Sequence, residues 1–261
     1  MELLSTSQVS KSFGSRKVLR DISIRLEEGE LVSLLGLSGS GKTTLLNILS
    51  GLLPPDEGRV FLAGQDITGR PGHISYMLQK DLLLEHKKII DNVSLPLVLR
   101  GMKKKEAREK ADPLFAQFGL EGTQMDYPSQ LSGGMRQRAA LLRTYLGSAS
   151  GVTLLDEPFS ALDMITKGQM HAWYQDMARK IGLSTVLITH DVDEAIQMSD
   201  RIYLLTGTPG EIRHEIRIEE PRTPGRNSAF RLNSWATSSG SWRYCRHEKM
   251  RNRRRSGHRA L

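Results

Sequence analysis

The chain reads Gly36-Leu37-Ser38-Gly39-Ser40-Gly41-Lys42-Thr43 between an apolar run at residues 31–35 and a stretch of helical spacing at residues 42–50. The glycines allow backbone N–H groups to turn toward phosphate oxygens, and the positive end of the following helix faces the same point. Lys42 is expected to reach the β- and γ-phosphates of a nucleotide, and the Thr43 hydroxyl to bind Mg²⁺. The alternative is an ordinary Gly-rich turn, but four fixed positions between a strand and a helix favour a nucleotide site.

Two carboxylates follow a second apolar run, at residues 152–155. Asp156 would close this strand and hold the Mg²⁺ shell, while Glu157 would orient or deprotonate the attacking water. An acidic pair at the end of a strand is, taken alone, more often a surface turn, and Thr153 interrupts the apolar run. In combination with the phosphate loop, the pair predicts phosphoryl-transfer chemistry.

A second helix start has the features of an anion site. Ser132 is a favoured N-cap residue, and Gly133 and Gly134 leave the backbone accessible at the first turn. A capped helix after a loop would explain this pattern by itself. Since one chain seldom needs two such sites for one triphosphate, we expect this helix to face a γ-phosphate that a second chain holds.

Short apolar runs alternate with helix-length stretches along residues 1–220. Strand character occurs at 31–35, 74–77, 152–155 and 185–189, and helical spacing at 42–50, 132–146, 164–180 and 191–198. This alternation predicts an α/β protein with a largely parallel, buried sheet. Ile22, Ile24 and Leu26 alternate with polar residues, and the first 30 residues and residues 58–63 are more typical of antiparallel strands.

The segment at 79–131 lacks strand character and is predicted to be a mostly helical insertion. Apolar residues recur there at helical spacing, namely Ala107, Ala111, Leu114, Phe115 and Phe118. Because Pro113 falls inside this pattern, we expect a helix to start or kink at that point. The lysine-rich run at 103–106 is expected to form a solvated face.

The formal charge of +8 is distributed unevenly. Residues 221–261 contain 11 Lys or Arg and one acidic residue, so this segment carries +10 and residues 1–220 carry −2. From about Pro224 the chain shows no hydrophobic period, although Trp235 and Trp242 lie there. We expect residues 225–261 to be a disordered tail or an atypical C-terminus, translated outside its ancestral frame.

Several observations favour a protein of the cytosol. The longest stretch without a charged residue, 43–55, has 13 residues, whereas a membrane-spanning helix needs about 20 apolar residues. Residues 1–6 lack the basic start and apolar run of a secretory signal, and Cys245 is the single cysteine. We therefore expect no span, no leader and no intrachain disulfide.

The motifs together resemble those of a known family. In order along the chain they are the phosphate loop, Gln79, Leu131-Ser132-Gly133-Gly134-Met135-Arg136-Gln137-Arg138, Leu154-Leu155-Asp156-Glu157-Pro158, Ser160-Ala161-Leu162-Asp163 and Thr189-His190-Asp191. Over about residues 3–224, this order resembles the ATP-binding subunits of ABC transporters. It looks closest to bacterial importers of the nitrate, sulfonate and taurine type. The implied fold is a P-loop ATPase with an antiparallel β subdomain and a helical subdomain at about residues 80–145.

The resemblance implies roles for some of these residues. The nucleotide would contact Phe13, Gly36, Ser38, Gly39, Ser40, Gly41, Lys42, Thr43, Thr44, Ser132, Gly133, Gly134 and Asp163, the last four across a dimer interface. Mg²⁺ would be near Thr43, Gln79 and Asp156, and Glu157, His190 and Gln79 would act in hydrolysis. Alone, Phe13 is as often a core residue, Gln79 carries no signal, and His190 is more often a helix-start or core histidine.

The predicted function is that of an ATP-hydrolysing subunit that energises import of a small solute. The predicted cofactors are ATP and Mg²⁺. Predicted partners are a second ATPase subunit, a separate membrane permease and, indirectly, an extracytoplasmic solute-binding protein, so that the chain would lie at the cytoplasmic face of the membrane.

Two alternatives stay open at this point. One is a soluble ABC-type ATPase that acts on nucleic acid or ribosomes, and the other is a defective subunit that serves only as a binding module. Only about 52 residues separate Gln79 from Ser132, too few for a long coiled-coil arm. One cassette is present instead of a tandem pair, so no nucleic-acid partner is expected.

Overall fold

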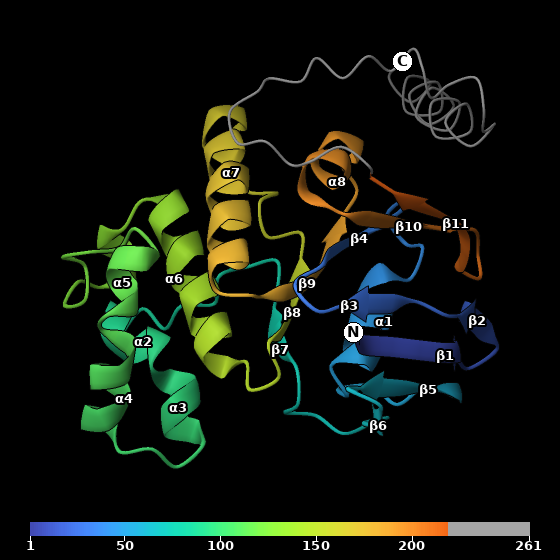
Figure 1. Cartoon of the computed structure of the whole chain (residues 1–261), viewed down its shortest axis with the longest axis horizontal. Helices are drawn as coiled ribbons and strands as arrows, with labels where there is room; N and C mark the ends of the chain where they lie inside the picture. Colours follow the sequence, from blue (N-terminus) through green and yellow to red (C-terminus); the bar gives the residue numbers. More distant parts are fainter. Residues whose placement is uncertain (219–261) are drawn as a thin grey trace, which may run out of the picture. The chain divides into compact units, whose positions relative to one another are not determined.

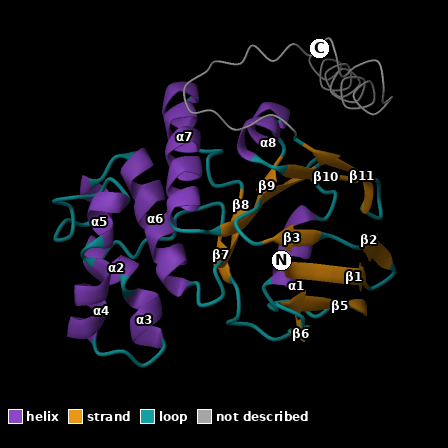
Figure 2. Ribbon diagram, in the orientation of Figure 1, coloured by secondary structure: helices purple, strands orange, loops and turns teal. Residues whose placement is uncertain are grey.

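The computed structural model describes residues 1–218. The predicted tail at 225–261, with Trp235, Trp242 and Cys245, lies outside the described residues. Within residues 1–218, no helix is long and apolar enough to cross a membrane. The elements, shown in Figures 1 and 2, are β1 (Glu2–Phe13), β2 (Arg16–Ile22), β3 (Arg25–Glu27), β4 (Leu31–Leu35), α1 (Lys42–Leu49), β5 (Glu57–Leu62), β6 (Gln65–Asp66), β7 (Ser75–Met77), α2 (Ile89–Val93), α3 (Leu95–Leu99), α4 (Lys104–Ala111), α5 (Leu114–Gln117), the 3₁₀ helix η1 (Pro128–Gln130), α6 (Gly133–Gly147), β8 (Val152–Asp156), α7 (Met164–Lys180), β9 (Ser184–Thr189), α8 (Val192–Met198), β10 (Arg201–Thr206) and β11 (Glu211–Arg217).

A six-stranded sheet forms the centre of the fold, in the order β11-β10-β4-β9-β8-β7. All neighbouring pairs are parallel except β10 and β11. Successive side chains of β9 enter opposite cores: Leu187 packs with α6 and α7, whereas Val186 and Ile188 pack with α1 and the second sheet. Because both faces are covered, the strands read as continuous apolar runs, and the predicted parallel, buried sheet is confirmed.

The second sheet is antiparallel and follows the order β2-β1-β5-β6, with β3 paired to β1. The predicted antiparallel subdomain is therefore confirmed. The alternating residues Ile22, Ile24 and Leu26 belong to two strands: Ile22 ends β2, Leu26 lies in β3, and Ile24 lies between them. The long strand β1 pairs with β2 at Val9 and with β3 at Leu4. Strands β2 and β3 therefore pair with different parts of β1 and are separate strands. All three apolar side chains are nevertheless buried.

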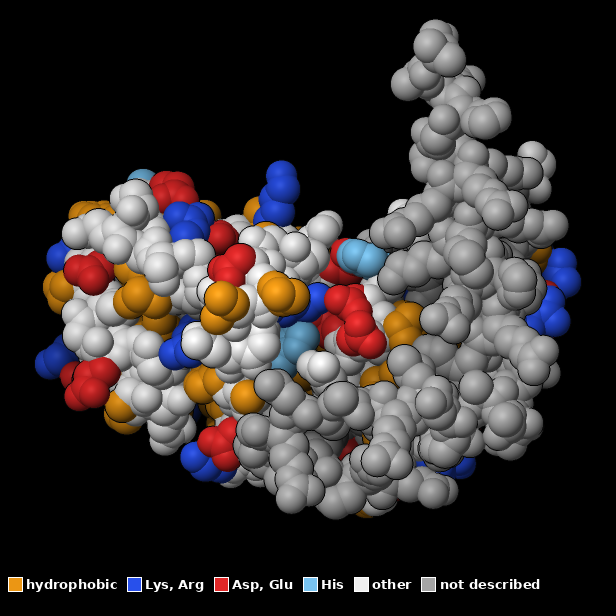
Figure 3. Space-filling model, turned by 90° about the horizontal axis from the view of Figure 1, so that it is seen from above, with side chains coloured by type: hydrophobic (Ala, Val, Ile, Leu, Met, Phe, Trp, Pro, Cys, Tyr) orange, Lys and Arg blue, Asp and Glu red, His pale blue; other side chains and the backbone are white. Residues whose placement is uncertain are grey.

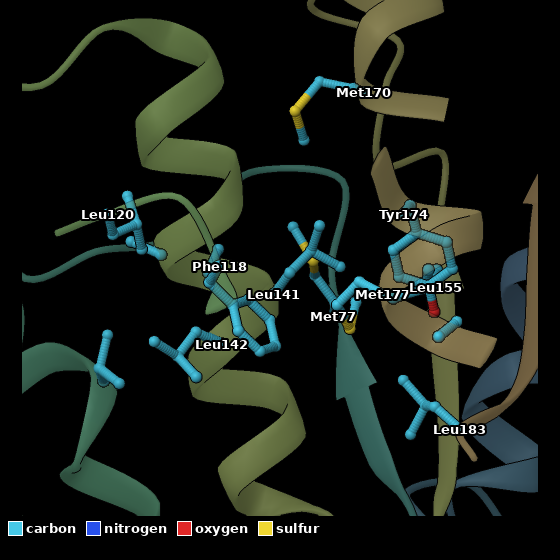
Figure 4. Packing of buried hydrophobic residues seen from close by; sticks show 14 of the residues in the cluster. Met77, Phe118, Leu120, Leu141, Leu142, Leu155, Met170, Tyr174, Met177 and Leu183 are labelled. Atoms are coloured by element: carbon cyan, nitrogen blue, oxygen red, sulfur yellow. The ribbon is translucent and has the colours of Figure 1, made fainter. Parts of the chain in front are cut away.

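The segment between β7 and β8 is helical, as predicted, and lies to one side of the central sheet in Figure 1. Pro113 directly precedes α5 and separates it from α4, because a proline cannot supply the N–H that a continuous helix needs. The lysine-rich run at 103–106 is exposed, as expected. In Figure 4, Leu141 of α6 meets Met77 of β7 and Met177 of α7, which joins this segment to the sheet.

The four helices whose bounds were predicted, α1, α6, α7 and α8, begin and end within one residue of the prediction. Helix α7 has the predicted bounds, and α6 and α8 begin directly after their N-cap residues Ser132 and Asp191. Strands β10 and β11 were not predicted. Strand β11 reads Glu-Ile-Arg-His-Glu-Ile-Arg and is an exposed antiparallel edge, so it has no continuous apolar run to reveal it.

Candidate functional site

Three parallel strands end at the same edge of the central sheet and deliver the candidate site residues. Strand β4 leads into loop 36–41, β8 leads into Glu157, and β9 leads into His190. Carboxyl ends of parallel strands meet at one edge, and this is where open α/β sheets bind ligands. The topology thus brings together side chains that are far apart in the sequence.

The loop between β4 and α1 depends on its glycines. Gly39 and Gly41 have φ values of 83° and 98°, a region open to glycine but strained for other residues. Gly36 is packed closely: a Cβ there would overlap the carbonyl oxygen of Leu205 and lie 2.9 Å from Ser40 Oγ. The backbone can therefore curl tightly in front of α1 only with glycine at these positions.

Lys42 and Ser40 face the inside of this loop. The Lys42 ammonium donates hydrogen bonds to the carbonyl oxygens of Gly36 at 2.8 Å and Leu37 at 2.9 Å. Burial lowers the pKa of Lys42, while the charges of Glu157 and Asp156 oppose that shift. Ser40 Oγ is buried and has no hydrogen-bond partner within residues 1–218. A buried cation and an unsatisfied hydroxyl beside exposed backbone are the groups that a phosphate would satisfy.

Asp156 accepts two hydrogen bonds from hydroxyl groups. Thr43 Oγ1 lies 3.2 Å and Tyr76 Oη 3.3 Å from Asp156 Oδ2. Burial raises the pKa of Asp156, with Thr43 and Tyr76 opposing the shift, and burial together with Asp156 raises the pKa of Tyr76. No group of three or more His, Cys, Asp or Glu within residues 1–218 forms a metal cage. The donor set of one carboxylate and one threonine hydroxyl fits Mg²⁺, which takes few protein ligands and is otherwise held by substrate phosphates and water.

Glu157 and His190 contact each other across the ends of β8 and β9. Glu157 Oε1 lies 2.9 Å from His190 Nδ1, and the two side chains are 20% and 60% exposed. Glu157 has a φ of 46°, which is uncommon for a residue other than glycine. Its N–H donates to the Ile188 carbonyl at 3.1 Å, and its carbonyl accepts from Ser160 Oγ at 2.9 Å. The main chain therefore holds this strained residue in place and aims its carboxylate at the imidazole.

Gln79 is exposed two residues after β7 and reaches the same loop. Its Nε2 donates to Ser160 Oγ at 3.3 Å, and Ser160 is bonded to the Glu157 carbonyl. The Ser160 hydroxyl therefore links the Gln79 side chain to the main chain of Glu157 through two hydrogen bonds. Ser160 opens the motif Ser160-Ala161-Leu162-Asp163 but was given no role of its own. Tyr76 was not singled out from the sequence, because a tyrosine at this position carries no local signal.

The predicted site residues at the start of α6 and at Asp163 are not hydrogen-bonded to the phosphate loop. The Ser132 side chain accepts from the Met135 N–H at 3.3 Å, and Asp163 Oδ1 accepts from the N–H groups of Ile165 and Thr166 in the first turn of α7. Within residues 1–218, no hydrogen bond links either side chain to loop 36–43. Gly133 is exposed and Gly134 half-buried.

Phe13 and Thr44 complete the predicted contacts of the nucleotide. Phe13 is 52% exposed at the end of β1, and the Lys11 ammonium lies 5.9 Å from its ring centre. Thr44 follows Thr43 in α1 and is half-buried.

Comparisons with known proteins show which family this architecture represents. A family model described as ABC transporter matches residues 19–160. The formylaminopyrimidine import ATP-binding protein ThiZ of Halalkalibacterium halodurans is 45% identical over 209 residues, which cover 80% of this chain and 81% of ThiZ. The taurine import ATP-binding protein TauB of Escherichia coli K12 is 38% identical over 220 residues, covering 84% of this chain and 86% of TauB. The sulfate/thiosulfate import ATP-binding protein CysA of Synechococcus elongatus is 39% identical, and the match covers 85% of this chain but 65% of CysA.

Solved structures agree with the sequence relatives. The ATP-binding cassette MJ1267 of an ABC transporter superimposes with a TM-score of 0.74 at 25% identity, over 83% of this chain and 92% of that one. The cassette MJ0796, in a dimeric post-hydrolysis state bound to ADP and Pi, superimposes with a TM-score of 0.70 at 29% identity, over 84% of this chain and 100% of that one. The predicted P-loop fold with its antiparallel and helical parts is therefore confirmed.

Proposed function

The chain belongs to the ATP-binding subunits of ABC transporters, in which ATP hydrolysis is coupled to transport, and on this basis we propose that it energises import of a small solute through a separate permease. One observation carries the proposal: Lys42, the Thr43–Asp156 pair and the Glu157–His190 pair lie at one edge of the sheet. Relatives named for import of taurine, sulfate or formylaminopyrimidine support an oxyanion or a small heterocycle as the solute. Nitrate, sulfonate and taurine remain the proposed substrate group.

Each residue at this edge has a proposed task. Backbone N–H groups of loop 36–41, Ser40 and Lys42 bind the phosphates, and Thr43 and Asp156, together with Gln79, hold Mg²⁺. Mg²⁺, when bound, neutralises charge on the phosphate oxygens. Glu157 takes a proton from the attacking water, and His190 holds Glu157 and contacts the γ-phosphate.

A second copy of the chain completes the site in this proposal. The exposed start of α6 and the exposed Asp163 have no partner in the phosphate loop of their own chain, and the related MJ0796 is dimeric with ADP and Pi. We propose that Ser132, Gly133 and Gly134 cap the γ-phosphate bound by the other chain. Phe13 is exposed enough to stack on adenine.

The permease is proposed to dock near the segment after Gln79. Leu78 and Leu82, which are 43% and 52% exposed there, offer apolar side chains to such a contact. Through the permease the chain would lie at the cytoplasmic face of the membrane, and a solute-binding protein would supply specificity. In this proposal residues 1–224 form the ATP-binding domain, with residues 80–145 as its helical subdomain.

A role on nucleic acid has less support. Residues 1–220 carry a net −2, and on the described part of the face in Figure 3 the basic and acidic side chains are interspersed. Sequence-independent nucleic-acid binding needs a basic stripe that neutralises phosphates. ThiZ and TauB are both named as import proteins, which also favours transport.

Two experiments test the proposed function. Phosphate release by the purified chain with ATP and Mg²⁺ is expected to exceed that of Lys42→Ala, because this variant lacks the cation inside the phosphate loop. Purification from native membranes in mild detergent, followed by mass spectrometry, is expected to recover a permease and a solute-binding protein. Equal phosphate release by both proteins would refute the ATPase, and recovery of ribosomal proteins or nucleic acid instead of a permease would refute the import role.

A further inference from the structure

A partly buried ionic cluster lies beneath the turn that carries His190, and its Asp191 side chain is 41% exposed. Lys167 Nζ donates to Asp191 Oδ2 at 2.9 Å and lies 3.2 Å from Glu194 Oε1, which is also 2.8 Å from His171 Nε2. The side chains of Glu194 and His171 are 3% and 8% exposed, and that of Lys167 is 21% exposed. None of these four residues belongs to the nucleotide site proposed above.

The cluster connects three segments that each bear a proposed site residue. Lys167 lies in the first turns of α7, where its N–H donates to the carbonyl of the N-cap residue Asp163 at 2.8 Å. Asp191 directly follows His190. His171 packs edge-on against Phe159, with ring centres 4.9 Å apart, and Phe159 follows Glu157 by two residues.

Hydrogen bonds and ion pairs connect the polar groups of this cluster in the folded chain. Burial acts to raise the pKa of Glu194, but hydrogen bonds from His171 and Thr189 and the charge of Lys167 outweigh it and leave the pKa below its ordinary value. Replacing buried ion pairs by apolar residues is often neutral or stabilising, so their presence is weak evidence for a role in stability. A role in orientation accounts better for their position under the turn.

We propose that Lys167 and Glu194 are positioning residues that hold the turn 189–191 so that His190 stays against Glu157, and that they tie this turn to the start of α7. The inference rests on the proposed catalytic roles of Glu157 and His190. Lys167 donates to Asp191 in this turn, and Glu194, near the start of α8, lies 3.2 Å from the Lys167 ammonium. The His190 imidazole is itself 60% exposed, and its Nδ1 lies 2.9 Å from Glu157 Oε1.

Loss of Lys167 is expected to loosen the turn without unfolding α8. Asp191 Oδ1 caps that helix separately, by accepting from the Asp193 and Glu194 N–H groups at 3.0 and 3.3 Å. Within residues 1–218, no hydrogen bond joins Lys167, His171 or Glu194 to loop 36–43, so ATP binding is expected to be retained. A displacement of about 1 Å at a reacting group can lower turnover roughly 100-fold.

The experiment compares Lys167→Met, Lys167→Arg and the control Lys180→Met by steady-state phosphate release. Lys180 lies on the same helix in an exposed pair with Asp176, its side chain 72% exposed. Lys167→Met is expected to lower kcat roughly 10- to 100-fold with KM for ATP unchanged. Lys167→Arg is expected to restore most of kcat, because it keeps the charge and the donors, and Lys180→Met is expected to match the unmodified chain.

A double variant separates this inference from the proposed function. If Lys167 acts through His190, Lys167→Met is expected to have no further effect in a His190→Ala background. Full activity of His190→Ala would refute the proposed role of His190, whereas an inactive His190→Ala with a fully active Lys167→Met would refute the positioning role alone.

Other outcomes also decide the inference. Three results would each overturn it. They are a rise in KM of Lys167→Met equal to its fall in kcat, a kcat of Lys167→Arg as low as that of Lys167→Met, and an equal fall of kcat in Lys180→Met. If Lys167→Met does not fold, Glu194→Gln replaces it, since the amide has the same size and can still accept from His171. That variant is expected to show the same fall in kcat.

Discussion

Glu157→Gln is the substitution that tests the proposed chemistry most directly. The amide has nearly the size of the carboxylate but lacks the negative charge and the basicity needed to take a proton from water. The Glu157 backbone is held by Ile188 and Ser160, not by its own side chain. The strained loop is therefore expected to keep its conformation, and the free energy of unfolding to stay unchanged.

The expected loss of turnover follows from the removal of a general base. Removing a general base lowers a rate typically 100- to 10,000-fold, or about 3 to 5 kcal/mol in the barrier. Lys42, Thr43 and Asp156 keep their own contacts, so ATP binding is expected to persist. With binding intact and hydrolysis blocked, the variant is expected to accumulate as an ATP-bound dimer.

The assay is size-exclusion chromatography with ATP and Mg²⁺, together with measurement of phosphate release. Glu28→Gln, in the exposed turn before β4, controls for the chemical change, and Lys42→Ala is the non-binding control. Hydrolysis by Glu157→Gln at the unmodified rate would refute the role of Glu157. A monomer with bound ATP, in the presence of the permease as well, would refute the shared site.

Further substitutions test packing and pH dependence. Gly36→Ala is expected to lower the free energy of unfolding by about 1 to 3 kcal/mol in urea denaturation, since the added methyl meets the Leu205 carbonyl. The control Gly168→Ala, in open space on α7, is expected to raise the free energy of unfolding by up to about 1 kcal/mol. A loss of stability in Gly168→Ala equal to that in Gly36→Ala would contradict the steric argument. The bidentate hydrogen bonds from Arg108 lower the pKa of Asp91, so this ion pair stabilises the fold above the ordinary Asp pKa of about 3.9 and its contribution is lost as the pH falls below that value. Arg108→Met is accordingly expected to lower the free energy of unfolding by about 1 kcal/mol at pH 7 and by progressively less below about pH 4. A difference in unfolding free energy between the two proteins that does not change with pH would count against the ion pair.

Local sequence was sufficient wherever neighbouring residues decide the structure. The bounds of α7 follow from the cap at Asp163 and the helical spacing after it, and Pro113 separates two helices because it lacks an N–H. The buried strands β4, β8 and β9 were visible as apolar runs because both faces of the sheet are covered, whereas β10, which is equally buried, was not predicted. Strand β11 escaped prediction because an exposed edge strand need not be apolar.

What the sequence by itself determined is the inventory of the site: a glycine loop before a helix, two carboxylates after a strand, and a histidine after another. Those patterns are local, since backbone conformation and helix capping depend on adjacent residues. Only the tertiary structure decided which of these groups meet, such as Thr43 with Asp156, and His190 with Glu157. It also brought Lys167 under the His190 turn. Contacts of this kind depend on the order of parallel strands in the sheet, which joins residues that no sequence spacing relates.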